Sequence, residues 1–143
     1  MCLINSKKLK HTEPITCYKL VEKNKLNNYF TVFRDMRMEL NKTYEIPSTS
    51  LNPVGKQKQI SINAFHSFVS LDSLKQYIKL FMEYTIEDYS ETEIKKFAIL
   101  ECVIPTDSKY TFKGTFDSEF SDEVDCSSYA SQKIIPIKEI PIE

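Results

Sequence analysis

Histidine and cysteine are the residue types in this chain that could supply a nucleophile, a general base or a soft metal ligand. His11 and His66 stand far apart, and the four cysteines, at positions 2, 17, 102 and 126, form no Cys-x-x-Cys pair. A structural zinc site needs four such ligands at close spacing, so the pattern predicts no metal site. Cys102 or Cys126 with His66 would have the residue types of a nucleophile and its base, but neither lies in a local motif. We therefore expect no catalytic residue, no metal ligand and no cofactor.

His66 is the strongest candidate for contact with a ligand. It lies in an alternating apolar run over residues 64–70, where a strand pattern ends at Ser70, a suitable first residue for a helix. This order would bring His66 and Ser67 close to the amide donors of the helix start, which suits a phosphate or a hydroxyl group. A lone histidine is also often a structural residue bonded to a main-chain carbonyl. Both interpretations stay open, and the functional one is a hydrogen-bond donor in a binding cleft.

A second candidate is the hydroxyl-rich stretch over residues 126–133, which precedes an apolar pair of isoleucines. Strand alternation would place Tyr129, Ser131 and Lys133 on one face. Such a polar row fits either a solvated edge strand or a strand that faces a ligand.

Glycine is nearly absent, and this limits how the chain could hold a phosphate. Gly55 and Gly114 are the two glycines of the chain. The glycine-rich loops that bring main-chain amides to a phosphate in the common nucleotide-binding motifs are therefore excluded. The two arginines, Arg34 and Arg37, could instead form a phosphate clamp, or they could simply be solvent-exposed charges.

Two acidic segments offer surfaces that a protein partner could recognise. Residues 83–93 could extend a helix, form a second short helix or loop outward. Residues 117–125 lack the order and the glycine of a helix-flanked calcium loop, so we expect a solvated loop there.

Composition restricts the class of protein. The chain has 143 residues, 41% of them hydrophobic, which suits one compact domain. Its 19 basic and 20 acidic side chains balance, so we expect neither sequence-specific nucleic-acid binding nor membrane binding. The N-terminus lacks the apolar core of a signal peptide, and no uncharged stretch approaches the ~20 residues of a membrane span. With no cysteine pair, these features predict a protein of the cytoplasm.

Apolar patterns predict the secondary structure. Residues 1–14 should form an arm, and residues 47–59, which collect Ser, Thr, Asn, Pro and Gly55, a mobile loop. One main helix is expected over residues 71–82, where Leu71, Leu74 and Ile78 recur at intervals of three and four. Strands are expected at 15–21, 29–34, 38–46, 60–69, 96–104, 109–116 and 127–137, with 96–104 buried on both faces. The sum is a single α+β domain over residues 15–143 with a mixed or mostly antiparallel sheet.

The order of several short motifs resembles a known group of proteins. These motifs are Met1-Cys2-Leu3, then Phe65-His66-Ser67-Phe68, an apolar run closing in Ile104-Pro105, and residues 129–135. They resemble a family of small uncharacterised proteins of gut bacteria and their phages. The resemblance spans most of the chain and implies no particular activity.

The same order is similar to the second half of ADP-ribosyltransferases, which have a strand, a helix, an apolar strand ending in Ile-Pro and a strand with a catalytic glutamate. Around the place where that fold would carry its glutamate, this chain has Ser131, Gln132 and Lys133. An amide cannot replace the carboxylate. The resemblance therefore implies a nucleotide-shaped cleft that binds without turnover.

Three functions follow as expectations. The first is a non-catalytic binder of a small nucleotide-like or otherwise anionic ligand, with the role of a phage-encoded anti-defence protein that sequesters a host immune signal in the host cytoplasm. The second is a protein-interaction module that inhibits or adapts a host or phage protein. The third is an unrecognised ADP-ribosyltransferase-like enzyme. Assembly of several copies into a homo-oligomer is left open.

Overall fold

The computed structural model describes residues 3–32, 36–46, 55–56, 60, 64–85, 97–117 and 122–142, with helix side chains described as far as Phe81. All strand pairs found in these ranges are antiparallel. The elements in chain order are β1 (Leu3–Lys8), β2 (Ile15–Lys23), β3 (Tyr29–Thr31), β4 (Arg37–Met38), β5 (Tyr44–Glu45), β6 (Phe65–Phe68), α1 (Leu71–Thr85), β7 (Phe97–Ile104), β8 (Thr111–Phe116), β9 (Ser127–Ser131) and β10 (Lys133–Ile140). The predicted α+β class with a mostly antiparallel sheet and one main helix is confirmed in this broad form, although strand dominates.

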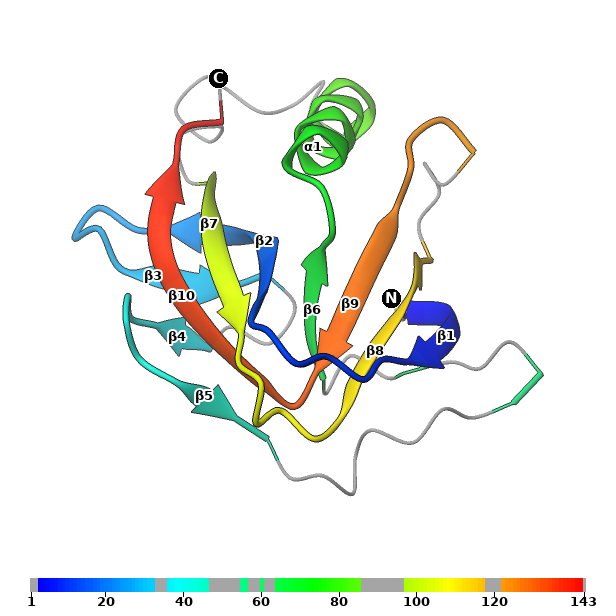
Figure 1. The fold of residues 1–143 in the computed structure, drawn as a ribbon. Helices are drawn as coiled ribbons and strands as arrows, with labels where there is room; N and C mark the ends of the chain where they lie inside the picture. The colour runs from blue at the N-terminus through cyan, green and yellow to red at the C-terminus, as the bar shows by residue number, and fades with distance from the viewer. Residues whose placement is uncertain are drawn as a thin grey trace.

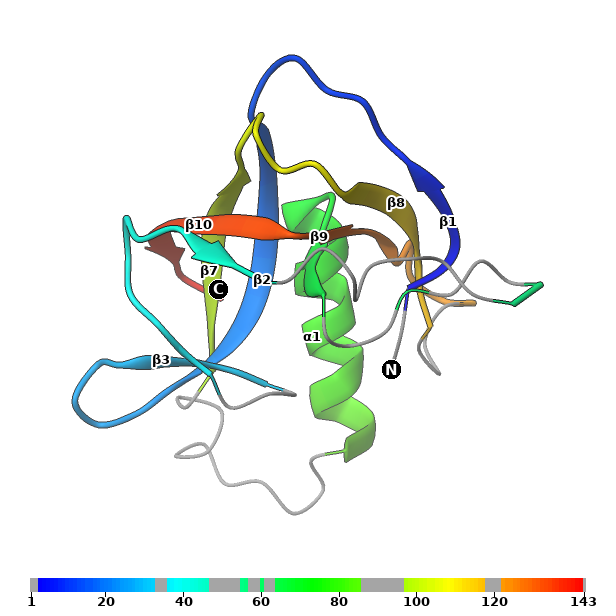
Figure 2. The same cartoon turned by 90° about the horizontal axis from the view of Figure 1, so that it is seen from below.

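The strands form one curled sheet, a half-barrel with α1 against it (Figure 1). The strand order is β1-β8-β9-β6-β2-β7-β10-β5, and β3 and β4 branch from β2. From below, α1 runs alongside β2, with β3 on the other side of that strand (Figure 2). The strand β2 is therefore the element at which the sheet, its branch and the helix meet.

The centre of the sheet is the pair β2 and β7, which are in register from Ile15, opposite Ile104, to Glu22, opposite Phe97. Cys17, Leu100 and Cys102 are fully buried in this pair. The predicted strands at 15–21 and 96–104 are confirmed. An apolar run of this length packs well in a central strand because both of its faces are covered.

The predicted helix is also confirmed, and α1 runs three residues beyond the predicted end at 82. The Ser70 Oγ accepts a hydrogen bond from the Ser73 N–H at 3.3 Å, as expected of a helix cap. Leu74 and Ile78 are buried against Phe68 and other side chains of the sheet. The apolar stripe therefore fixes which face of α1 meets the sheet.

The branch of β3 and β4 folds back toward β10 and closes one side of the half-barrel. Tyr29 Oη donates a 2.6 Å hydrogen bond to Glu139 Oε1, and the Asn41 N–H donates a 2.7 Å bond to the Pro136 carbonyl. Met38 is buried inside this closure. The branch therefore forms a wall of the fold.

The prediction of a simple arm over residues 1–14 was wrong, because β1 pairs with β8 in this segment. Leu3 is fully buried, but most other side chains of β1 are polar, so the segment lacks the apolar alternation from which a strand is predicted. The pairing is irregular between Ile4 and Lys7, and Asn5 has a φ of 53°. Such a local bulge breaks the alternation that a strand prediction reads.

Two long strands that the sequence predicted are each broken in two. The segment 38–46 reverses at Asn41, with a φ of 63°, so that β4 pairs with β3 while β5 pairs with β10. The segment 127–137 bends at Gln132, whose N–H donates to the Tyr110 carbonyl and whose carbonyl accepts from the Ile46 N–H. The two halves, β9 and β10, therefore pair with different neighbours.

Other predicted strands are found in shorter form. The segment 109–116 forms β8, and 29–34 is a strand over Tyr29–Thr31 in its described part. The segment 60–69 is a strand at Phe65–Phe68, while Ile60 makes an isolated bridge to Leu3.

Several predicted features lie outside the described residues. They include Arg34, most of the expected loop over 47–59, and residues 86–93 and 118–121 of the two acidic segments. In the part of the chain that is described, no helix has the length and apolar content needed to cross a membrane.

Candidate ligand-binding pocket

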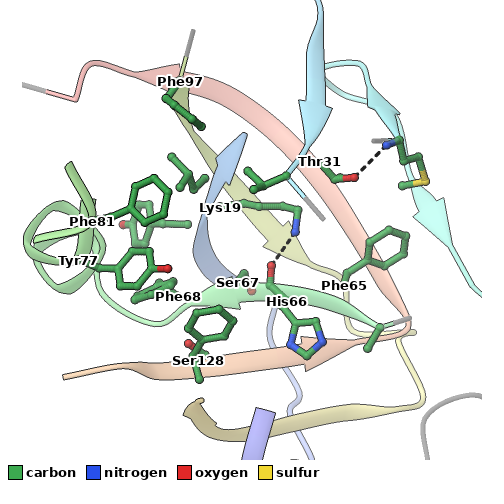
Figure 3. A pocket seen from close by; sticks show the side chains of 16 residues that line it. Lys19, Thr31, Phe65, His66, Ser67, Phe68, Tyr77, Phe81, Phe97 and Ser128 are labelled. Atoms are coloured by element: carbon green, nitrogen blue, oxygen red, sulfur yellow. Dashed lines mark hydrogen bonds between the residues drawn. The ribbon is translucent and has the colours of Figure 1, made fainter. Parts of the chain in front are cut away.

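A pocket opens where two strands diverge along one edge of β2. On this edge Tyr18 pairs with Phe68 of β6, and Val21 pairs with Thr31 of β3. The two β2 residues between these pairs have no strand partner on this edge among the described residues. A cavity of about 160 Å³ lies at this divergence (Figure 3). Its lining comes from β2, β3, β6, α1, β7, β8, β9 and residues that flank β3, β4 and β6: Tyr18, Lys19, Leu20, Thr31, Val32, Met36, Ala64, Phe65, His66, Ser67, Phe68, Tyr77, Phe81, Phe97, Phe116 and Ser128.

Strand alternation gives the pocket two different sides. Leu20 and Phe68 pack in the cluster that contains the buried face of α1. Because successive side chains of a strand point to opposite faces, Lys19 and Ser67 lie on the other side. The pocket therefore connects an apolar region beneath the helix with a more polar region beside β3.

The first region, which we name the ring side, consists of Phe68, Tyr77, Phe81, Phe97 and Phe116. The Phe68 and Tyr77 rings are 5.4 Å apart between centroids, and the Phe116 ring lies 5.9 Å from each of them. Tyr77 and Phe81 are stacked at 6.2 Å, and Phe97 meets Phe81 edge-on at 6.4 Å. These separations are typical of attractive aromatic pairs, so the rings form one connected wall.

The second region, which we name the polar side, consists of Lys19, Ser67 and Thr31. Lys19 Nζ donates a 2.8 Å hydrogen bond to the His66 carbonyl and so spans the gap between β2 and β6 (Figure 3). Thr31 Oγ1 accepts a 2.9 Å bond from the Met36 N–H, which links the end of β3 to the residue before β4. The polar side thus places an ammonium group in the wall of a largely apolar pocket.

Ser67 is 3% exposed, and its Oγ has no nitrogen or oxygen partner for a hydrogen bond among the described residues. Its hydroxyl lies beside the Cys17 thiol. Burial raises the pKa of Cys17 to about 12, against the opposing effects of the Ser67 hydroxyl and the Lys19 charge. Burial also raises the pKa of Cys102 and, with the charge of Asp125, that of Cys126. These thiols are therefore protonated and poorly nucleophilic near neutral pH.

Two of the predicted site residues, His66 and Ser67, line the pocket. The carbonyl of His66 contacts Lys19, while its imidazole points away from Lys19 (Figure 3). The amide donors at the start of α1 were expected to be available to a ligand. One of them, the Ser73 N–H, already donates a hydrogen bond to Ser70 Oγ. The sequence therefore pointed to a strand that lines the pocket, and the His66 group that contacts Lys19 is the main-chain carbonyl.

The other predicted residues lie elsewhere. Tyr129 and Ser131 pair with Ser67 and Phe65 in the sheet but do not line the pocket, whereas Ser128 does. Arg37 is the exposed residue of β4, and it donates to Asn28 Oδ1 at 3.1 Å. The expected ligand-binding row on one strand is therefore not formed.

Lys133 lies in a second, polar pocket of about 170 Å³ beside Gln132. Its Nζ is 2.9 Å from Asp107 Oδ2 and 3.9 Å from Glu45 Oε2. The hydrogen bond to Asp107 raises the pKa of Lys133 and lowers that of Asp107. The ammonium of Lys133 is therefore neutralised within the protein, and it is separate from the pocket that contains His66.

Sequence reasoning missed Lys19 and the ring side. Lys19 is a charged residue within the otherwise apolar run of 15–21, and Tyr77 and Phe81 are spaced by four on the helix. These signals could have marked both groups, but only the pairing of β2 with β3 and β6 brings them to one cavity.

The chemistry available at this site is recognition through rings, one ammonium and hydroxyl groups. Within the described ranges, no group of three or more His, Cys, Asp or Glu side chains could hold a metal ion. No protein-family model, curated protein or solved structure matches the chain.

Proposed function

We propose that this protein binds a small, anionic organic ligand without chemical turnover, in the pocket between β2, β3, β6 and α1. The observation that carries the proposal is the union of an apolar ring side and the Lys19 ammonium in one concave cavity. Binding sites for small molecules are commonly mostly apolar pockets with a few polar groups that fix orientation. The buried Ser67 hydroxyl is a further polar group of this kind.

The nature of the lining favours binding over catalysis. Among the described lining residues there is no carboxylate and no thiol. His66 is the one lining side chain that usually titrates near neutral pH, and acid–base catalysis generally needs it aimed at a reacting atom. The pocket therefore has the groups for affinity, and its described lining offers neither a carboxylate nor a thiol as a nucleophile.

An ADP-ribosyltransferase-like enzyme, and the fold that goes with it, is the alternative that the sequence resemblance suggests. The position of the missing glutamate falls near Gln132, which is 7% exposed, and Lys133, which is paired with Asp107. This arrangement supports the non-catalytic proposal instead. Release of nicotinamide from NAD by the purified protein, measured by chromatography, would favour the enzyme.

The biological setting we propose follows from the resemblance to small proteins of gut bacteria and phages. A phage protein that holds a host signalling molecule without destroying it would lower the free concentration of that signal. Such a role needs affinity and abundance but no catalytic group, which agrees with the lining of the pocket.

The proposal is tested by native mass spectrometry of the protein purified from its natural host. We expect a mass excess from a retained small molecule. The matched control is Ala64→Phe, because Ala64 is 3% exposed and lines the pocket, so a larger side chain there would fill the space. If the wild type carries no mass excess, or if the filled variant carries the same one, the proposed site is wrong.

A further inference from the structure

We infer that the ligand of this pocket is an aromatic acid with a single flat ring, whose ring packs on the ring side and whose carboxylate is bound by Lys19 and Ser67. This inference rests on the proposed function, and it specifies the chemical class of the ligand. It replaces the broader expectation of a nucleotide-like molecule.

The ring side favours an aromatic ligand over an aliphatic one. Phe68, Tyr77 and Phe116 meet one another at tilted and edge-on angles of 44°, 52° and 85°. Such a wall presents both ring faces and ring edges, which carry opposite partial charges. A flat aromatic ring can pair its own edge and face with these groups, whereas an alkyl chain gains only from burial.

The cavity has room to enclose one ring. Its volume is about 160 Å³. An apolar protein cavity of about 150 Å³ is known to hold benzene. A base joined to a ribose and a phosphate would greatly exceed this space, so a whole nucleotide could not be enclosed. One ring with a short acidic substituent fits the volume.

The polar side identifies the substituent as an anion with acceptor oxygens. Lys19 carries an ammonium, which has three N–H donors. Ser67 is buried on the same side of the strands, with a hydroxyl that lacks a nitrogen or oxygen partner in the described part of the chain. Lys19 Nζ bonds to the carbonyl of His66, the residue next to Ser67, so the two groups come from adjacent points of the pocket wall. A carboxylate could accept hydrogen bonds from both groups.

Buried hydroxyl groups normally bond to nitrogen or oxygen, and the weak contact of Ser67 with the Cys17 thiol leaves room for a stronger acceptor. A carboxylate oxygen bonded to Ser67 would satisfy its hydroxyl. One ammonium also matches the single charge of a carboxylate better than the two charges of a phosphate monoester. The polar side therefore favours an aromatic carboxylate over an aromatic phosphate.

The test is isothermal titration calorimetry with defined probes. The aromatic acids are benzoate, phenylacetate and 3-phenylpropionate, which vary the length between ring and carboxylate. Octanoate keeps the charge without a ring, benzyl alcohol keeps the ring without a charge, and adenosine monophosphate represents the nucleotide class. We expect at least one aromatic acid to bind about tenfold more tightly than each of the other three probes.

Variants test which residues of the protein bind the carboxylate end of the probe. Lys19→Met should weaken the best aromatic acid about tenfold or more and benzyl alcohol by a clearly smaller factor, because the variant removes the charged hydrogen bond to the carboxylate in addition to the bond to the His66 carbonyl. Ser67→Ala should weaken the same acid by a smaller factor. Lys23→Met, on the same strand but paired with Glu139, is the matched control and should bind like the wild type.

The outcomes separate this inference from the proposed function. If octanoate or adenosine monophosphate binds as tightly as the aromatic acids, and Ala64→Phe abolishes that binding, the ligand class is wrong while the pocket is still a ligand site. If no probe binds and the natural-host protein also lacks a retained molecule, both are wrong. Equal weakening of the aromatic acid by Lys19→Met and Lys23→Met would remove Lys19 from the site.

Discussion

Lys19 of β2 donates a 2.8 Å hydrogen bond to the main-chain carbonyl of His66 in β6, across the gap where the sheet divides. The only register pair between these two strands in the described residues is Tyr18 with Phe68. The lysine side chain therefore supplements a short ladder and holds together two walls of the pocket. Its role in the fold and its proposed role toward a ligand can be separated by experiment.

Lys19→Met should lower the free energy of unfolding by about 1–2 kcal/mol, because a hydrogen bond to a charged group is lost. Chemical denaturation measures this change. Compared with the wild type, the variant should show a larger increase in amide hydrogen exchange at β6, next to the lost contact, than at β7. Lys23→Met, which removes a partly exposed ion pair with Glu139, should have a smaller effect. Equal loss in both variants would show that Lys19 does not support β6.

The helix is held by its apolar stripe, and Leu74, at 0% exposed, is the most buried of the helix side chains up to Phe81. Leu74→Ala should destabilise the protein by about 2–5 kcal/mol, since it leaves a cavity between α1 and the sheet. Thermal or chemical unfolding measures the effect. Lys79→Ala, on the exposed face of the same helix, should stay within about 0.5 kcal/mol of the wild type. Similar values for both variants would contradict the observed packing.

Gly114 allows β1 to approach β8 closely. A Cβ atom added at this position would lie 2.5 Å from the main-chain oxygen of Ile4. Gly114→Ala should therefore push β1 away from β8 and increase amide exchange in β1, with a smaller change in β7. Thr115→Ala, at the next position, serves as the control. Unchanged exchange in β1 after Gly114→Ala would show that the strand does not pack at this distance.

The elements that the sequence predicted well are those with strong local patterns. The strand β7 is a continuous apolar run, and α1 has a capping serine and apolar residues at intervals of three and four. Neither depends on knowing the neighbours. By contrast, the reversal at Asn41 and the bend at Gln132 are set by contacts with distant residues, namely Pro136 for the first and Tyr110 and Ile46 for the second. A local sequence pattern therefore cannot predict which distant residues will form these hydrogen bonds.

The site was predicted in part for the same reason. His66 and Ser67 follow from the strand pattern before α1, and both line the pocket. Lys133 appeared to continue the polar row of β9, but the bend at Gln132 places it beside Asp107. Lys19 and Thr31 complete the pocket from β2 and β3, and β3 ends at Thr31, well before β6 begins at Phe65. Only the pairing of β2 with two separate strands shows that they meet.

The buried cysteines should react slowly in the folded protein. Because burial raises the pKa of Cys17 to about 12, only about one molecule in ten thousand carries this thiolate at pH 8. Alkylation by iodoacetamide, followed by mass spectrometry of peptides, should therefore label Cys17 and Cys102 much more slowly in native than in denatured protein. Rapid labelling of both in native buffer would show that the β2 and β7 pair opens frequently.

Alkaline pH should weaken the closure between β3 and β10. Tyr29 Oη donates to Glu139 Oε1 at 2.6 Å, and burial, together with this hydrogen bond and the carboxylate charge, raises the pKa of Tyr29 from 10.0 to about 12. A group whose pKa is raised on folding contributes stability that is complete below the unfolded value and is lost as the pH rises through the folded value. The Tyr29 contribution should therefore be complete below pH 10 and fall between pH 10 and 12.

The variant Tyr29→Phe isolates this contribution. Its unfolding free energy should be lower than that of the wild type at pH 8, and the difference should shrink between pH 10 and 12, because the wild type loses the contact there as well. Urea denaturation at a series of pH values measures both curves. Tyr44→Phe is the control, because the Tyr44 hydroxyl accepts a hydrogen bond from the Glu39 N–H. A Tyr29→Phe difference that stays constant up to pH 12 would show that the Tyr29–Glu139 contact does not hold the branch against β10.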